Sequence, residues 1–219
     1  MGDAHGFAEL LSAHSGELGA LGVDASAQAA LSAFLAELWH HNQSKNLVSR
    51  KLSRQVLITA HLMDSLLALP YLPHGGVVAD LGSGGGFPGI PLAICRPRVH
   101  FRLYEKSPVK LSFLEQASRH LDNLSVCGKL DPHSLDGDVD LAIARAFRPL
   151  PAALAASRQY FARGGRYLFY KGRREKIDEE IKAAKIPPHG YRITVLEPPQ
   201  GIEERHLLWI NPRQEDGLQ

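Results

Sequence analysis

The chain has 219 residues, 44% of them hydrophobic, which suits one globular domain with a sizeable core. Its 25 basic and 23 acidic side chains nearly balance, so net charge neither requires nor excludes a nucleic-acid partner. Two cysteines exclude a disulfide framework, no apolar run reaches the ~18 residues of a membrane span, and the N-terminus lacks a signal-peptide pattern, so we expect a cytoplasmic protein.

The first 73 residues predict a helical extension. Apolar residues at helical spacing indicate helices over residues 7–21, 27–41 and 54–69. Ser26 can cap the second of these helices, and Pro70 ends the third. A polar and basic connector, residues 42–53, separates the second helix from the third.

After Pro73, short apolar segments alternate with helical ones. Strands are predicted at the following positions: 77–79, 101–104, 124–127, 139–143 and 165–170. Helices begin near Pro88 and cover residues 110–120 and 151–161. This alternation predicts a doubly wound, Rossmann-like α/β sheet, mostly parallel and covered by helices on both faces. Strands at 191–196 and 206–210 predict an antiparallel closing pair. We therefore divide the chain into residues 1–73, a sheet domain at 74–212 and a tail at 213–219.

A glycine-rich loop, residues 80–89, lies between the first strand and the following helix. It holds five glycines in eight residues, which disfavours a plain tight turn. Gly84, Gly86 and Gly89 satisfy the G-x-G-x-x-G pattern, and Glu105 follows at the expected distance of about 20 residues. By spacing alone, the loop therefore fits a dinucleotide.

Asp80 changes that interpretation. A carboxylate at the end of the strand, beside the turn at Gly82, would repel a pyrophosphate, whereas it suits the ammonium and sulfonium groups of S-adenosylmethionine. The antiparallel end of the sheet also favours a methyltransferase. We therefore predict S-adenosylmethionine as the cofactor, with Asp80, Gly82 and Gly84 among the residues that bind it.

Two further acids follow later strands. Glu105 ends the second strand, where a carboxylate can accept hydrogen bonds from ribose hydroxyls. Asp131 follows the third strand, a position that faces the adenine in this topology. The alternatives are a solvated strand-end charge for Glu105 and a loop acid before Pro132 for Asp131.

Together these segments resemble the bacterial glucose-inhibited division protein B family, the small-subunit ribosomal RNA guanine-N7 methyltransferases. The resemblance extends over about residues 25 to 211. It rests on the following segments: 45–47, 61–65, 80–93, 144–147, 170–172 and 204–206.

The family resemblance implies roles at matching positions. Gly82 and Phe87 would contact the cofactor through the loop, and Leu130 with Asp131 would lie beside the adenine. Arg145 would be the catalytic arginine at the mouth of the active site and would also touch the cofactor. Glu105 stands where the family often has Asp, which keeps the carboxylate. The implied substrate is guanine N7 in 16S ribosomal RNA, free or in a small ribosomal subunit particle.

Guanine N7 has an in-plane lone pair and no proton, so its attack on a methyl group needs no general base. The task of the enzyme is alignment, with the reacting atoms ~3–3.5 Å apart. Phe147 could stack on the base or belong to the core. His61 and Asp64 share a helix face and are interpreted as a polar pair that braces packing or a loop.

Basic side chains near the ends of the fourth and fifth strands and in the connector are candidate contacts to RNA phosphates. They are Arg50, Arg148, Lys171 and Arg173. The alternative is solvated surface charge. The histidines show no metal-ligand spacing, so we predict no metal, and we expect a monomer. Two other functions stay open: a methyltransferase of another substrate, and a non-catalytic nucleotide- or RNA-binding module.

Overall fold

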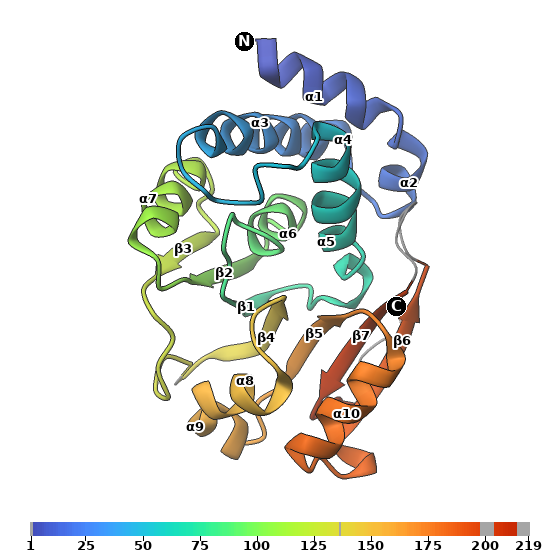
Figure 1. The fold of residues 1–219 in the computed structure, drawn as a ribbon, viewed down its shortest axis with the longest axis vertical. Helices are drawn as coiled ribbons and strands as arrows, with labels where there is room; N and C mark the ends of the chain where they lie inside the picture. The colour runs from blue at the N-terminus through green and yellow to red at the C-terminus, as the bar shows by residue number, and fades with distance from the viewer. Residues whose placement is uncertain (1, 136, 198–203, 214–219) are drawn as a thin grey trace.

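The computed structural model describes residues 2–135, 137–197 and 204–213, and it places seven strands from these residues in one sheet (Figure 1). The order across the sheet is β3-β2-β1-β4-β5-β7-β6. The strands have these bounds: β1 Gly76–Leu81, β2 Val99–Tyr104, β3 Leu124–Cys127, β4 Val139–Arg145, β5 Tyr167–Lys171, β6 Tyr191–Leu196 and β7 Arg205–Ile210.

Strands β3, β2, β1, β4 and β5 are parallel, and β7 pairs antiparallel with both β5 and β6. The prediction of a mostly parallel Rossmann-like sheet with an antiparallel C-terminal strand is therefore confirmed. The strand order reverses between β1 and β4, and ligands of such sheets bind beyond the carboxyl ends of the strands at that point. Those ends carry Leu81, Tyr104, Arg145 and Lys171.

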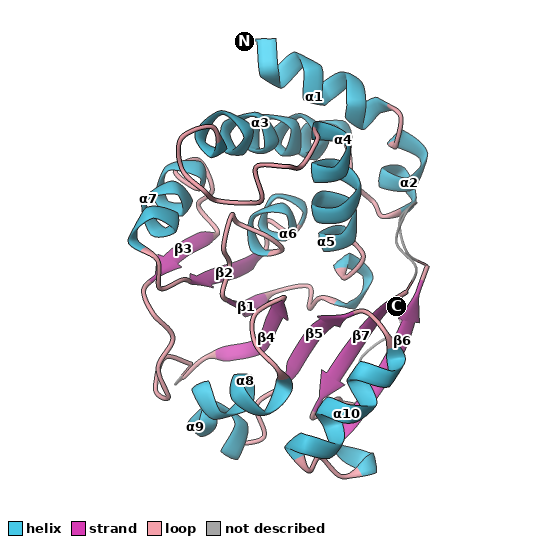
Figure 2. Cartoon of the chain, viewed as in Figure 1, coloured by secondary structure: helices cyan, strands magenta, loops and turns pink. Residues whose placement is uncertain are grey.

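Helices cover both faces of the sheet (Figure 2). One face carries α1 Gly2–Ser12, α2 Ser15–Ala20, α3 Ala25–Asn42, α4 Arg54–Leu57, the π-helical η1 Ile58–Met63, α5 Asp64–Leu66, the 3₁₀ turn η2 Leu69–Tyr71, α6 Gly89–Cys95 and α7 Pro108–Ala117. The other face carries α8 Leu150–Ala156, α9 Arg158–Ala162 and α10 Arg174–Ala184. A further 3₁₀ turn, η3 Pro188–Gly190, precedes β6.

The strand residues alternate between two hydrophobic cores, as the two-residue period of a strand requires. In β7, Leu207 and Trp209 face the N-terminal helices, while Leu208 and Ile210 face α8 to α10. The first core is continuous from Phe7 to the sheet, so the N-terminal helices pack directly on the strands. The domain boundary at residue 73 stays a prediction, and most of the predicted tail lies outside the described residues.

Three predicted helices are interrupted in the structure. The 7–21 segment forms α1 and α2, and the 54–69 segment passes through η1 and ends its α-helical part at Leu66. The 151–161 segment breaks at Ser157, whose hydroxyl is hydrogen-bonded to Ala153 O at 3.1 Å and to Tyr167 Oη at 2.8 Å. Helix α10 was not predicted at all. Among the described residues, no helix is both long and apolar enough to cross a membrane.

Candidate active site

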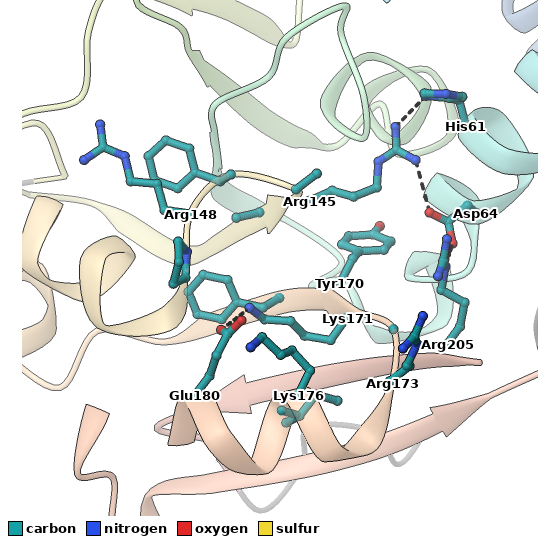
Figure 3. Close-up of a pocket in the computed structure, with 17 residues that line it drawn as sticks. His61, Asp64, Arg145, Arg148, Tyr170, Lys171, Arg173, Lys176, Glu180 and Arg205 are labelled. Carbon is teal, nitrogen blue, oxygen red and sulfur yellow. Dashed lines mark hydrogen bonds and ion pairs between the residues drawn. The ribbon is translucent and has the colours of Figure 1, made fainter. Parts of the chain in front are cut away.

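Two cavities lie next to each other where the parallel strands end. The loop cavity, about 460 Å³, is bounded by the glycine loop, by Glu105 and by the connector between α3 and α4. The basic cavity, about 770 Å³, lies between the ends of β4 and β5 and helix α10 (Figure 3). Both cavities are lined by the same five residues, the shared wall: His61, Arg145, Ala146, Phe147 and Arg148. Groups bound in the two cavities would therefore meet across this wall.

The backbone of the glycine loop requires its glycines. Gly82, Gly84 and Gly86 have φ angles of 79°, 59° and 94°, a region that residues with a Cβ rarely adopt. Gly82 N donates to Tyr104 O at 2.8 Å, which joins the loop to the end of β2. A Cβ atom on Gly82 would stand 2.4 Å from a ring carbon of Phe147. The loop thus lies against the shared wall with no space for a side chain at Gly82.

Asp80 lies behind the loop and does not line either cavity. Its carboxylate is fully buried, and Oδ2 accepts a hydrogen bond from Gly89 N at 3.1 Å. Oδ1 has no hydrogen-bond partner within the described part of the chain. Burial raises the pKa of Asp80 to about 7, because the charged form loses solvation. A cation bound nearby would stabilise the charged form. Because Asp80 does not line the cavity, its contact with the cofactor stays a prediction.

Glu105 lines the loop cavity and is 9% exposed. Its Oε2 accepts from Gly84 N at 3.1 Å, while Oε1 accepts from Lys106 N at 2.7 Å and Ser107 N at 2.9 Å. Each carboxylate oxygen has two lone pairs, so Oε1 is fully used and Oε2 retains one acceptor position. The geometry therefore leaves room for one strong hydrogen bond from a ligand.

Leu130 lines the loop cavity, whereas Asp131 is exposed and is not part of its lining. Asp131 Oδ1 accepts from His133 N at 2.8 Å, and this hydrogen bond lowers the pKa of the carboxyl. Asp131 N donates to Ser134 Oγ at 2.8 Å. The structure thus uses this carboxylate in a turn, and its contact with adenine stays a prediction.

Arg145 ends β4 and is held by helix η1 and its continuation α5. Its Nη1 donates to Ala60 O at 3.0 Å and to Asp64 Oδ2 at 3.1 Å, and Nη2 lies 3.0 Å from His61 Nδ1. The guanidinium carbon lies 5.4 Å from the centroid of the Phe87 ring. Figure 3 shows the side chain directed toward His61 and Asp64. These contacts agree with a bracing role for that polar pair.

Asp64 connects three distant segments. Its side chain is 2% exposed. One carboxylate oxygen contacts Arg145, and the other lies 2.5 Å from Arg205 Nε.

His61 is neutral near pH 7. Burial, followed by the charge of Arg145, lowers the pKa of its imidazole to about 4. A neutral imidazole can accept the hydrogen bond from Arg145, which a protonated one cannot.

Six basic side chains line the basic cavity: Arg145, Arg148, Lys171, Arg173, Lys176 and Arg205. Arg148 and Arg173 are exposed, and the Arg148 guanidinium lies 5.0 Å from the centroid of the Phe147 ring. Lys171 Nζ lies 2.6 Å from Glu180 Oε2, which also accepts from Leu150 N at 2.8 Å. Three of the four predicted RNA contacts are thus brought together here.

Arg50, the fourth, is exposed on the connector and lines neither cavity. Part of the lining of both cavities comes from residues that were not predicted to belong to the site. The connector contributes Leu47, Val48, Ser49 and Leu52 to the loop cavity, and α10 contributes Glu180 to the basic cavity. Within the connector, the available signal was the three apolar residues Leu47, Val48 and Leu52 in a segment that is otherwise polar.

Within the described residues, no group of three His, Cys, Asp or Glu side chains is placed to hold a metal ion.

The sheet order, the glycine loop after β1 and the carboxylate after β2 define a Rossmann-like methyltransferase. The fold alone is similar to that of Aeropyrum pernix fibrillarin, whose structure contains S-adenosylmethionine, with a TM-score of 0.51 and 22% identity over 68% of this chain and 73% of that chain.

Sequence comparison identifies the family. The family model described as rRNA small subunit methyltransferase G matches residues 27–208. The chain is 40% identical to ribosomal RNA small subunit methyltransferase G 1 of Bdellovibrio bacteriovorus, over 87% of this chain and 93% of that protein. It is 35% identical to the methyltransferase G of Methylobacillus flagellatus, over 89% of this chain and 94% of that protein. The chain therefore belongs to the rRNA small subunit methyltransferase G family.

Proposed function

We propose that the protein transfers the methyl group of S-adenosylmethionine to N7 of a guanine in 16S ribosomal RNA. The observation that carries this proposal is the pair of adjoining cavities. The loop cavity is lined by the backbone of the glycine loop and by Glu105, a carboxylate placed to accept a ribose hydroxyl. The basic cavity is lined by lysine and arginine side chains, and the shared wall lines both. Membership of the family supports the same reaction.

The residues of the loop cavity fit the cofactor. When bound, S-adenosylmethionine supplies an electrophilic methyl group. Glu105 Oε2 would accept one ribose hydroxyl, Leu130 would contact the adenine, and the backbone of Gly82 and Gly84 would approach the ligand closely. The buried carboxylate of Asp80 behind the loop supports a cationic cofactor over a dinucleotide.

The basic cavity would receive the RNA. Lys171, Arg173 and Arg148 would contact phosphates next to the target nucleotide, and Phe147, on the shared wall, offers a ring on which the base could stack. Guanine in an unpaired segment exposes its N7 edge, whereas the deep groove of an A-form duplex hides it. The target would therefore be a single-stranded or splayed guanine.

Arg145 would position the reacting groups and would not act as a base. It cannot donate a hydrogen bond to N7 during attack, because the lone pair is then forming the new bond. Its remaining roles are contact with guanine O6, with a phosphate or with the cofactor carboxylate. His61 and Asp64 would fix the guanidinium for this task. We further propose that the protein acts as a monomer in the cytoplasm and that its substrate is ribosomal RNA, either free or in a ribosomal particle.

The test is reverse-transcription mapping of N7-methylguanine in 16S ribosomal RNA from cells with and without the protein. We expect one modified guanine that disappears in its absence and returns on complementation. An unchanged methylation pattern would overturn the proposal. Calorimetric titration with S-adenosylmethionine and with NAD provides the second test, and saturable binding of NAD alone would favour the dinucleotide alternative.

A further inference from the structure

The connector between α3 and α4 forms a wall of the loop cavity. Four of its residues line that cavity although they precede the glycine loop by some thirty positions in the sequence: Leu47, Val48, Ser49 and Leu52. In Figure 1 the connector passes beside the loop that follows β1. The N-terminal extension therefore contributes directly to the site in which the cofactor would bind.

The connector packs tightly on the glycine loop. A Cβ atom added to Gly85 would stand 3.0 Å from Val48 Cγ1 and 3.5 Å from Leu47 O. Leu47 is 3% exposed, so its side chain belongs to the core, while Val48 is half-buried. This contact places the connector and the loop at a fixed separation, which sets the width of the cavity between them.

One buried side chain holds the connector in this position. Asn42, the last residue of α3, is 5% exposed. Its Oδ1 accepts from Leu47 N at 2.9 Å and from Val48 N at 3.0 Å. Leu47 N also donates to Lys45 O, whereas the described residues offer Val48 N no acceptor besides Asn42. The hydrogen bond of Val48 N–H is partly buried, and loss of its acceptor would be costly, so the backbone at Val48 depends on the Asn42 side chain.

We propose that Asn42 is a positioning residue for the cofactor: it fixes the backbone of Leu47 and Val48 so that the connector closes the loop cavity. The inference rests on the proposed use of this cavity by S-adenosylmethionine. After Asn42 the connector contains no helix or strand, and its other backbone hydrogen bonds are local ones that span two to four residues. Without the Asn42 acceptor, the connector samples other conformations, and the cofactor must order it on binding.

The decisive experiment compares Asn42→Leu with Asn42→Asp in the full chain. Leucine has nearly the same shape but no acceptor, whereas aspartate keeps an oxygen at the same place. We expect Asn42→Leu to raise the Kd and the KM for S-adenosylmethionine about tenfold, equivalent to about 1.4 kcal/mol, with kcat at saturating cofactor little changed. Asn42→Asp should restore most of the affinity. Gln43→Leu, the same kind of change at the exposed neighbouring position, is the matched control.

The outcomes separate this inference from the proposed function. If the unmodified protein binds no S-adenosylmethionine, the proposed function fails. If it binds, and folded Asn42→Leu binds equally well, only the role of Asn42 is overturned. If Asn42→Asp loses as much affinity as Asn42→Leu, the acceptor is not what matters, and the inference also fails.

Hydrogen exchange decides the matter if Asn42→Leu does not fold. In the unmodified protein without cofactor, the Val48 amide should exchange much more slowly than the amide of Asn46, an exposed residue of the same connector. Equal exchange at the two amides would show that Asn42 does not hold the connector.

Discussion

The two adjoining cavities are built in different ways. The glycine loop, on one side of the loop cavity, depends on the backbone of one contiguous segment, in which three glycines adopt positive φ angles and the amides contact Tyr104 and Glu105. The basic cavity depends on side chains that are distant in the sequence. Asp64, for example, pairs with Arg145 and with Arg205, which lies 141 positions away. A locally encoded loop can thus be recognised in the sequence, whereas a charge network exists only after folding.

This contrast predicts different consequences of mutation. A change in the loop should remove cofactor binding and leave the charge network intact. A change at Arg145 or Arg205 should affect RNA and stability together, because both pair with the buried carboxylate of Asp64. The predictions below are ordered from the largest expected effect to the smallest.

Gly82→Val should abolish detectable binding of S-adenosylmethionine, a loss of at least ~100-fold. A branched side chain is strained at φ 79°, and its Cβ would collide with the Phe147 ring. Calorimetry measures the affinity, and far-UV circular dichroism reports whether the variant folds. Gly16→Val is the control, because a Cβ there meets no atom within 4 Å. Undiminished affinity in folded Gly82→Val would contradict the assignment of the loop.

Glu105→Gln should weaken the cofactor by about 1.5–3 kcal/mol, the scale of a charge-assisted hydrogen bond. The amide would also direct a donor toward one of the backbone N–H groups that Glu105 now accepts from. Glu115→Gln, at an exposed position of α7, is the control. An affinity loss below about twofold would mean that Glu105 does not hold the ribose.

Arg145→Ala should lower the single-turnover methylation rate at least ~10-fold, equivalent to about 1.4 kcal/mol of transition-state stabilisation. The same change should also lower stability, because the buried Asp64 would lose one of its two cationic partners. Thermal unfolding should therefore show a loss of about 1–3 kcal/mol. A normal rate per folded molecule would exclude a catalytic role.

Lys171→Ala should weaken RNA binding severalfold. It should also reduce the slope of log affinity against log salt concentration by about one, as expected for the loss of one phosphate contact. It also removes the cation that pairs with Glu180, so the negative charge of that carboxylate in the basic cavity is no longer neutralised. Lys182→Ala is the control, because Lys182 is an exposed lysine on α10, the helix that carries Glu180. Filter binding over a range of salt concentrations measures the slope. Equal slopes for the two variants would assign Lys171 to the fold alone.

The sequence predicts the fold class well because, within each strand and most helices, the spacing of the apolar residues indicates the type of element. It predicts α10 poorly, since only Ile177 and Ile181 of that helix are buried and its remaining residues are mostly charged. Helix interruptions were also missed. The break at Ser157 depends on a hydrogen bond with Tyr167 in a strand, and no local pattern encodes such a contact.

The candidate site divides in the same way. Gly82, Phe87, Glu105 and Leu130, which the sequence and the family resemblance indicate as cofactor contacts, all line the loop cavity. Their contact with the cofactor stays a prediction. The ion pair of Lys171 with Glu180 could not be predicted, because it requires α10 to pack at the end of β5. The role of the connector was missed for a related reason: the acceptor of Asn42 is used by amides five and six residues later, in a segment without regular structure.

The position of β7 has a consequence for the time at which the protein becomes active during its synthesis. β7 is the last described strand of the chain, yet it lies between β5 and β6. Its first residue, Arg205, supplies the second cation for Asp64. A chain emerging from the ribosome can form β1 to β5 and the loop cavity early. It completes the basic cavity only when residues 205–210 are released and enter the sheet. A nascent chain would therefore lack a complete site for ribosomal RNA until residues 205–210 have joined the sheet.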